Sequence, residues 1–142
     1  MENYSDSDLL EIFENTKTIA VVGFSMNPSR PSHYVAKYLV SQGYKVIPVN
    51  PGHAGTEVFG TTIRASLADI DEPVDMVDVF RRSDAVPEVV DAALEHLPGL
   101  KTIWMQLGVE HEGAAKKARA RKVTVVMNRC PKIEYPRVML GL

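Results

Sequence analysis

Five short apolar runs recur along the chain, and stretches with helical spacing of apolar residues separate most of them. Continuous apolar character over so few residues indicates strands that are buried on both faces, which is typical of a parallel sheet covered by helices. The predicted strands are residues 18–22, 45–49, 74–79, 100–105 and 123–127.

Helices are predicted before the first strand and in most of the connections. Ser5 and Asp8 have the spacing of a capping box, which predicts a helix that ends near residue 15. Gly43 ends the second helix. The tail, residues 133–142, carries apolar residues that could fold onto the sheet or pair two subunits. The remaining predicted helices are residues 33–42, 86–96 and 112–121, with a possible single turn at 66–70.

This alternation of strands and helices predicts an α/β fold over residues 1–142, in one domain. The sheet should be open and parallel, with right-handed crossovers and helices on both faces. Ligands of such sheets bind outside the carboxyl ends of the strands, where the strand order reverses. The residues predicted at this edge are Gly23, Ser25, Arg30, Pro31, Ser32, Asn50, Pro51, Phe80, Arg81, Arg82, Gln106, Leu107, Gly108, Asn128, Arg129 and Cys130.

The loop after the first strand indicates phosphate chemistry. It begins at Gly23, is rich in small residues, and leads into a helix whose free N–H groups and dipole favour an anion. Arg30 adds a positive charge in the loop, and Arg81, Arg82 and Arg129 follow later strands at the same edge. We therefore expect a basic rim around one crevice and a ligand that carries several phosphates.

Composition narrows the class of protein. The chain has 16 basic and 18 acidic residues and a net charge of −2, which argues against a protein that coats nucleic acid. No apolar stretch approaches the roughly 18 residues of a membrane span. The histidines show no metal-site spacing. A single cysteine, Cys130, suits a reducing compartment. Together these features lead us to expect a cytoplasmic protein with no bound metal and no membrane or nucleic-acid partner.

A dinucleotide cofactor fits the residues less well. The usual fingerprint has three glycines and an acidic residue after the second strand, whereas this loop has Ser25 and Pro28 at the later glycine positions and Asn50 at the acidic one. Cys130 is open to two interpretations. It could be a small buried apolar residue, or a thiol that meets a thiol-bearing ligand, because neighbouring positive charge favours the thiolate.

Six motifs in order give the chain a family resemblance. They are residues 19–25 (IAVVGFS), 27–32 (NPSRPS), 44–51 (YKVIPVNP), 78–82 (DVFRR), 104–108 (WMQLG) and 128–132 (NRCPK). The chain resembles the small stand-alone CoA-binding proteins, which are similar to the CoA-binding domain of the succinyl-CoA synthetase alpha subunit. The resemblance implies a Rossmann-like three-layer sandwich with strand order 3-2-1-4-5 and coenzyme A as the ligand.

The resemblance also implies a layout for the ligand. Asn50 and Pro51 would lie beside the nucleotide, Phe80 and Arg81 would flank the adenosine end, and residues 106–108 would border the pantetheine arm. The phosphates would be held by Gly23, Ser25, Arg30, Pro31 and Ser32. Three functions stay open. The first is a CoA or acyl-CoA carrier, sensor or regulatory module without turnover. The others are an enzyme that uses Cys130 on a CoA thioester or CoA disulfide, and a regulatory domain that binds NAD or another nucleotide.

Overall fold

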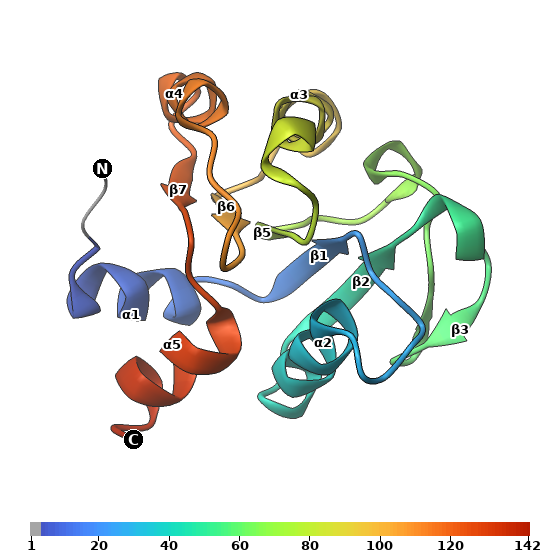
Figure 1. The fold of residues 1–142 in the computed structure, drawn as a ribbon, viewed down its shortest axis with the longest axis horizontal. Coiled ribbons are helices and arrows are strands. Elements are labelled where there is room, and N and C mark those ends of the chain that lie inside the picture. The colour runs from blue at the N-terminus through green and yellow to red at the C-terminus, as the bar shows by residue number, and fades with distance from the viewer. Residues whose placement is uncertain (1–3) are drawn as a thin grey trace.

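Five parallel strands form the central sheet of the computed structural model, which describes residues 4–142 (Figure 1). All five lie where the apolar runs predicted them, because strands covered on both faces need continuous apolar sequence. Their side chains are buried almost throughout. The strands are β1 (Thr18–Val22), β2 (Lys45–Val49), β5 (Met76–Val79), β6 (Thr102–Met105) and β7 (Thr124–Val126).

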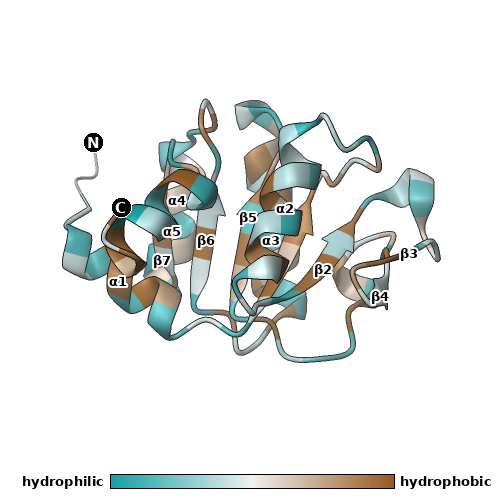
Figure 2. Ribbon diagram, turned by 90° about the horizontal axis from the view of Figure 1, so that it is seen from below, coloured by the Kyte–Doolittle hydropathy of each residue, from teal (hydrophilic) through white to brown (hydrophobic). Residues whose placement is uncertain are grey.

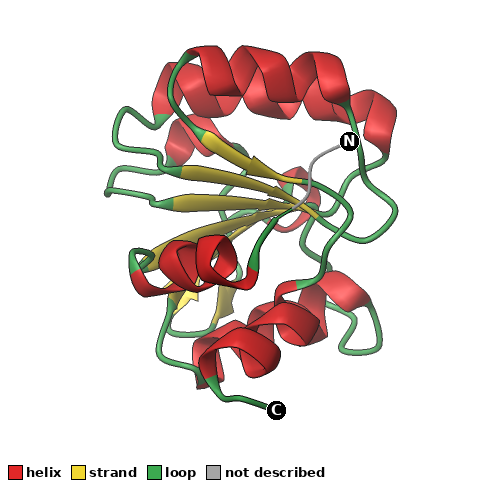
Figure 3. Cartoon of the chain, turned by 90° about the vertical axis from the view of Figure 1, so that its left-hand side faces the viewer, coloured by secondary structure: helices red, strands yellow, loops and turns green. Residues whose placement is uncertain are grey.

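Helices cover both faces of this sheet, as predicted (Figure 3). Alternate residues of each strand point to opposite faces, so Ala20 packs with the α3 and α4 side and Val21 with the α1, α2 and α5 side. Apolar residues gather on the strands and on the helix sides that face them (Figure 2). The helices are α1 (Asp6–Glu14), α2 (Pro31–Ser41), α3 (Val86–His96), α4 (Glu112–Ala120) and α5 (Pro131–Met139).

The strand order corrects one expectation. It is β2-β1-β5-β6-β7, so the third long strand lies beside β1 and not beside β2, as the order 3-2-1-4-5 required. The register Ala20↔Val77 fixes that pairing. A single parallel bridge between Val49 and Arg64 lies at the β2 edge, because the segment there is too irregular to form a full strand. The order therefore reverses between β1 and β5.

The segment between β2 and β5 combines short elements. A two-stranded hairpin is formed by β3 (Glu57–Val58) and β4 (Thr61–Thr62), and the predicted turn near residue 66 is a 3₁₀ turn at Leu67–Asp69. Two further 3₁₀ turns, Pro51–His53 and Ser83–Ala85, follow β2 and β5.

The two ends of the chain pack together on one face. The predicted capping box of α1 is present, with the Asp8 N–H donating to Ser5 Oγ over 3.0 Å. The tail forms α5, which packs against α1 and α2 through Tyr135, so of the two expected fates it folds onto the sheet. Among the described helices, none has both the length and the apolar character needed to span a membrane.

Candidate functional site

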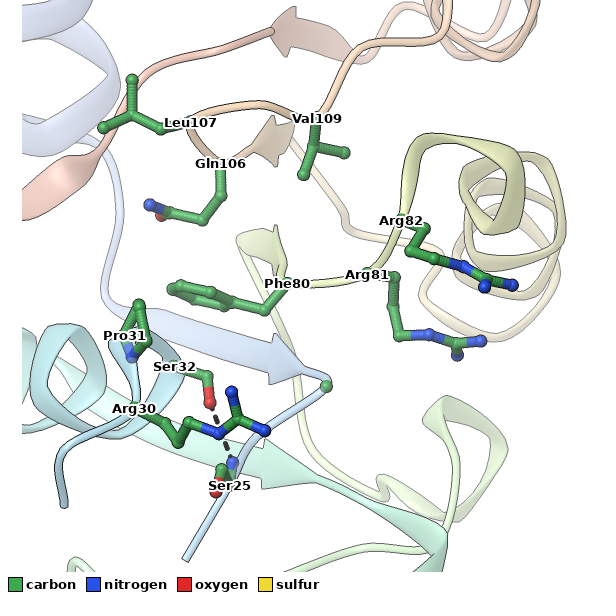
Figure 4. A pocket seen from close by; sticks show the side chains of 11 residues that line it. Ser25, Arg30, Pro31, Ser32, Phe80, Arg81, Arg82, Gln106, Leu107 and Val109 are labelled. Carbon is green, nitrogen blue, oxygen red and sulfur yellow. Dashed lines mark hydrogen bonds between the residues drawn. The ribbon is translucent and has the colours of Figure 1, made fainter. Parts of the chain in front are cut away.

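A cleft opens at the carboxyl ends of β1, β5 and β6, beside the first turn of α2 (Figure 4). Its volume is about 610 Å³, which lies in the range of small-molecule sites. The strand order reverses at this edge, which is where open α/β sheets bind ligands. All lining residues except Val109 belong to the set predicted for this edge. They are Gly23, Ser25, Arg30, Pro31, Ser32, Phe80, Arg81, Arg82, Gln106, Leu107 and Val109.

The loop between β1 and α2 is held by hydrogen bonds from outside it. The Asn50 side chain donates from Nδ2 to the Phe24 carbonyl oxygen over 2.7 Å, and its Oδ1 accepts from the Gly52 N–H over 2.8 Å. The His33 ring lies 2.9 Å from the Ser25 carbonyl oxygen through Nδ1 and stacks on Phe24. These contacts hold the carbonyl groups of Phe24 and Ser25 in place.

Ser32 lies in the first turn of α2, at the cleft. Its Oγ accepts from the Ser25 N–H over 2.9 Å, and this bond ties the loop to the first turn of the helix. The backbone N–H of Ser32 donates to no acceptor within residues 4–142, as is usual for the first turn of a helix. A free N–H group at the positive end of the helix dipole favours a phosphate or carboxylate in the cleft.

Three arginines give the cleft its positive charge. Arg30 extends over the loop near Ser25, whereas Arg81 and Arg82 extend from the end of β5 toward α3 (Figure 4). Neither Arg30 nor Arg81 pairs with a carboxylate of residues 4–142, and Arg82 makes one exposed ion pair of 3.4 Å with Asp84. The guanidinium groups therefore remain able to bind an anion.

A second cleft of about 530 Å³ adjoins the first and shares Gly23 and Arg81 with it. Asn50 and Pro51, which the family resemblance puts beside the nucleotide, line this second cleft. The wall of this cleft at residues 65–67 was not predicted from the sequence. The chain there returns to β2 through a single bridge, between Val49 and Arg64, and has no apolar run that would indicate a strand. Ser66 and Asp69 form a capping box whose spacing was the available signal. The lining residues are Val22, Gly23, Val49, Asn50, Pro51, Ala65, Ser66, Leu67, Arg81, Glu88, Val89 and Ala92.

The far wall of the first cleft is built by Phe80 and Gln106. Their side chains extend in the same direction from the ends of β5 and β6, and the Phe80 ring points toward Pro31 (Figure 4). Gln106 is 5% exposed, and its Oε1 has no hydrogen-bond partner within residues 4–142. Asp78, two residues before Phe80, is fully buried, and this burial raises the pKa of its carboxyl well above the ordinary value.

Four predicted residues lie outside the lining of both clefts. The Asn128 side chain accepts from the Gly108 N–H over 2.7 Å, so these two residues hold neighbouring loops together. The Arg129 carbonyl oxygen accepts from Trp104 Nε1 over 2.8 Å. Cys130 is the N-cap residue of α5 and is 7% exposed within the apolar face. The structure thus gives these positions packing contacts, and a ligand contact at any of them stays a prediction.

Comparisons with known proteins identify relatives over most of the chain. The family described as CoA binding domain matches residues 17–136. The uncharacterized protein YneT of Bacillus subtilis (strain 168) is 39% identical over 135 residues, which cover 95% of this chain and 97% of that protein. A solved structure of a protein from Thermus thermophilus is 40% identical and covers 95% of this chain and 99% of its own, with a TM-score of 0.89.

A third relative is part of a larger enzyme. The alpha subunit of the ADP-forming acetate–CoA ligase I of Pyrococcus furiosus is 31% identical over 86 residues, which are 58% of this chain and only 19% of that subunit. The resemblance to a CoA-binding domain of ligase alpha subunits is therefore shown as a distant homology. With a match that extends from β1 into α5, this chain belongs to the CoA-binding domain family.

Proposed function

We propose that this chain binds coenzyme A across the two adjoining clefts and acts as a carrier, sensor or regulatory module without turnover of its own. The membership of the CoA-binding domain family supports the ligand class. The residues present also fit the ligand, because free N–H groups and arginines match phosphates while apolar walls match the pantetheine arm.

The observation that carries the proposal is the position of the arginines. The chain has a net charge of −2, yet Arg30, Arg81 and Arg82 all line one cleft. Coenzyme A carries a pyrophosphate and a 3′-phosphate, and guanidinium groups bind phosphates through paired hydrogen bonds. Local concentration of positive charge on an acidic chain favours such a ligand over an uncharged one.

The shape of the two clefts suggests how the ligand would lie. Gly23 and Arg81 belong to both clefts, so the pyrophosphate would sit at their junction, near the Ser32 N–H. The adenosine would occupy the second cleft beside Asn50, and the pantetheine arm would follow the wall of Phe80 and Gln106. This layout agrees with the family resemblance for the phosphates, for Asn50 and for Gln106, but it puts Phe80 beside the pantetheine arm and not at the adenosine end.

The absence of turnover rests on the side chains that line the clefts. Among the described lining residues there is no cysteine and no histidine, which are common nucleophiles and general bases. Cys130, the thiol considered for an enzyme, is buried beside α5. These observations favour a binding module over the Cys130-dependent enzyme.

Calorimetric titration of the reduced protein with CoA tests the proposal, with NAD and adenosine as control ligands. We expect saturable binding of about one CoA per chain and much weaker binding of both controls. Comparable affinity for NAD would favour a nucleotide-binding regulatory domain. No CoA binding at millimolar concentration would overturn the proposal.

A further inference from the structure

Two buried polar side chains beneath the cleft have no partner in the described chain. Both carboxyl oxygens of Asp78 lack a hydrogen bond within residues 4–142, and so does Oε1 of Gln106. Asp78 is 0% exposed and Gln106 is 5% exposed. A buried polar atom without a partner lowers the stability of the fold by about 1–3 kcal/mol. Each of these oxygens is therefore expected to have a hydrogen-bond donor.

The register of the sheet puts the two residues on the same face. Asp78 pairs with Trp104 across β5 and β6, and Gln106 follows Trp104 by two residues, so their side chains point the same way. Strand spacing and rise place the two Cα atoms about 8 Å apart. Two side chains of this length can bridge that separation.

The environment of Asp78 does not favour a charged carboxylate. Burial is the cause of its raised pKa. On this face, α1 and α2 contribute apolar residues and Ser32. The buried titratable groups are Tyr44, Cys130, Tyr135 and Glu134, and Glu134 is paired with Arg137 over 2.7 Å. None of these supplies a positive charge. An ionised Asp78 would therefore be a buried charge without compensation, whereas the neutral acid can donate one hydrogen bond.

We propose that Asp78 keeps its proton and donates it in a hydrogen bond to Oε1 of Gln106, which turns the Gln106 NH₂ group toward the cleft as a donor. Asp78 is then a positioning residue, and the NH₂ group of Gln106 donates a hydrogen bond to a carbonyl oxygen of the ligand. This inference rests on the proposed function. It assigns Gln106 to an amide or thioester carbonyl of the pantetheine arm, so the site distinguishes a pantetheine-bearing ligand from its nucleotide part alone.

Proton loss from Asp78 reverses this arrangement. A carboxylate can only accept, so it would attract the Gln106 NH₂ group and leave Oε1 facing the ligand carbonyl. The contribution of Gln106 to CoA affinity is therefore constant below the raised pKa of Asp78 and is lost as the pH passes through it. Affinity for adenosine 3′,5′-bisphosphate, which lacks the arm, does not follow this change.

Calorimetry with CoA and adenosine 3′,5′-bisphosphate at a series of pH values tests the inference. Gln106→Leu should weaken CoA about tenfold and leave the bisphosphate unchanged. Asp78→Leu should do the same, and Asp78→Asn, which keeps a donor, should restore CoA binding and remove its decline at high pH. The exposed Asp71→Asn serves as a matched control.

A ligand-free measurement accompanies the titrations, in case Asp78→Leu fails to fold. Carboxyl carbon NMR of the protein labelled at aspartate should show one neutral aspartate at pH 7, absent from Asp78→Asn. An ionised Asp78 would overturn the inference. If Gln106→Leu lowered the affinity for both ligands equally, or lowered neither affinity, the inference would be overturned while the proposed function stands. No binding of CoA to the native protein would overturn both.

Discussion

Gly23 and Phe80 touch where the two clefts meet. A Cβ atom added to Gly23 would lie 2.3 Å from the carbonyl oxygen of Phe80, closer than real Cβ contacts allow. Gly23 also has a φ of 86°, in the left-handed region that favours glycine. The end of β1 can approach the end of β5 only because this position lacks a side chain, and the close approach shapes the floor of the site.

Gly23→Ala should therefore damage both folding and binding. We expect a loss of more than about 2 kcal/mol in the free energy of unfolding, since backbone strain and a backbone clash act together. CoA affinity should fall more than tenfold, because the loop after β1 must move. Denaturant unfolding and calorimetry measure the two effects.

Gly55→Ala is the matched control. Gly55 has a φ of 88°, and an added Cβ would meet nothing within 4 Å. Its substitution should cost about 1–2 kcal/mol from backbone conformation alone and leave CoA affinity unchanged. Equal effects of the two substitutions on binding would argue against a special role for the Gly23–Phe80 contact.

Arg30→Ala and Arg81→Ala should each weaken CoA binding about tenfold or more. A charge-assisted hydrogen bond to phosphate contributes about 1.5–3 kcal/mol, and neither arginine has a carboxylate partner in the described chain that would compete for it. At least one variant should also narrow the advantage of CoA over dephospho-CoA, which lacks the 3′-phosphate. Arg121→Ala, at the exposed end of α4 and outside both clefts, is the control. Unchanged affinity in both variants would refute the basic cleft as the anion site.

Asp75 should make folding stability depend on acid pH. Partial burial would raise the pKa of this carboxyl, but the Thr18 and Lys17 N–H groups, at 3.0 and 2.9 Å, and Lys101 outweigh burial and lower it. A lowered folded pKa means that the stabilisation is present above the ordinary pKa and is lost as the pH falls through the folded value.

Asp75→Asn should accordingly reduce stability by about 1.5–3 kcal/mol at pH 7. The difference from the native protein should shrink below about pH 4, where the carboxyl of the unfolded chain is protonated. Asp91→Asn removes an exposed ion pair with Lys117 and should change stability by less than about 1 kcal/mol. A difference that persists unchanged into acid would show that charge is not the cause.

Cys130 should react slowly in the native protein. Its side chain is 7% exposed at the start of α5, and a thiolate must reach solvent to attack a disulfide. We expect reaction with CoA disulfide to be at least about tenfold slower than in the unfolded chain. Mass spectrometry of the native protein follows the reductant-sensitive adduct, and rapid formation of that adduct would revive the hypothesis of a ligand thiol beside Cys130.

The sequence was most informative where a local property decides the structure. Buried parallel strands need continuous apolar runs, so all five strands were predictable, and the spacing of Ser5 and Asp8 identified the start of α1. The edge that holds the cleft was predictable as well, because parallel strands bring all their carboxyl ends to one side. The prediction that Gly23 and Arg30 belong to the cleft followed from the position of that edge.

Long-range packing decided the rest. Which strand lies beside β1 depends on hydrogen bonds between residues far apart in sequence, such as the pair Ala20 and Val77, and every strand here has the same apolar character. Whether Asn128 reaches the ligand or ties down Gly108 depends on how two loops meet.

The burial of Asp78 also belongs to the tertiary structure. Its sequence neighbours indicate a strand but do not say how completely α2 and α5 cover that face. Residue patterns along the chain thus specify the fold class, the edge of the sheet that holds the cleft and the positive charge there. The strand order, the contact between Gly23 and Phe80 and the burial of Asp78 and Gln106 depend instead on contacts between residues distant along the chain, which no local pattern encodes.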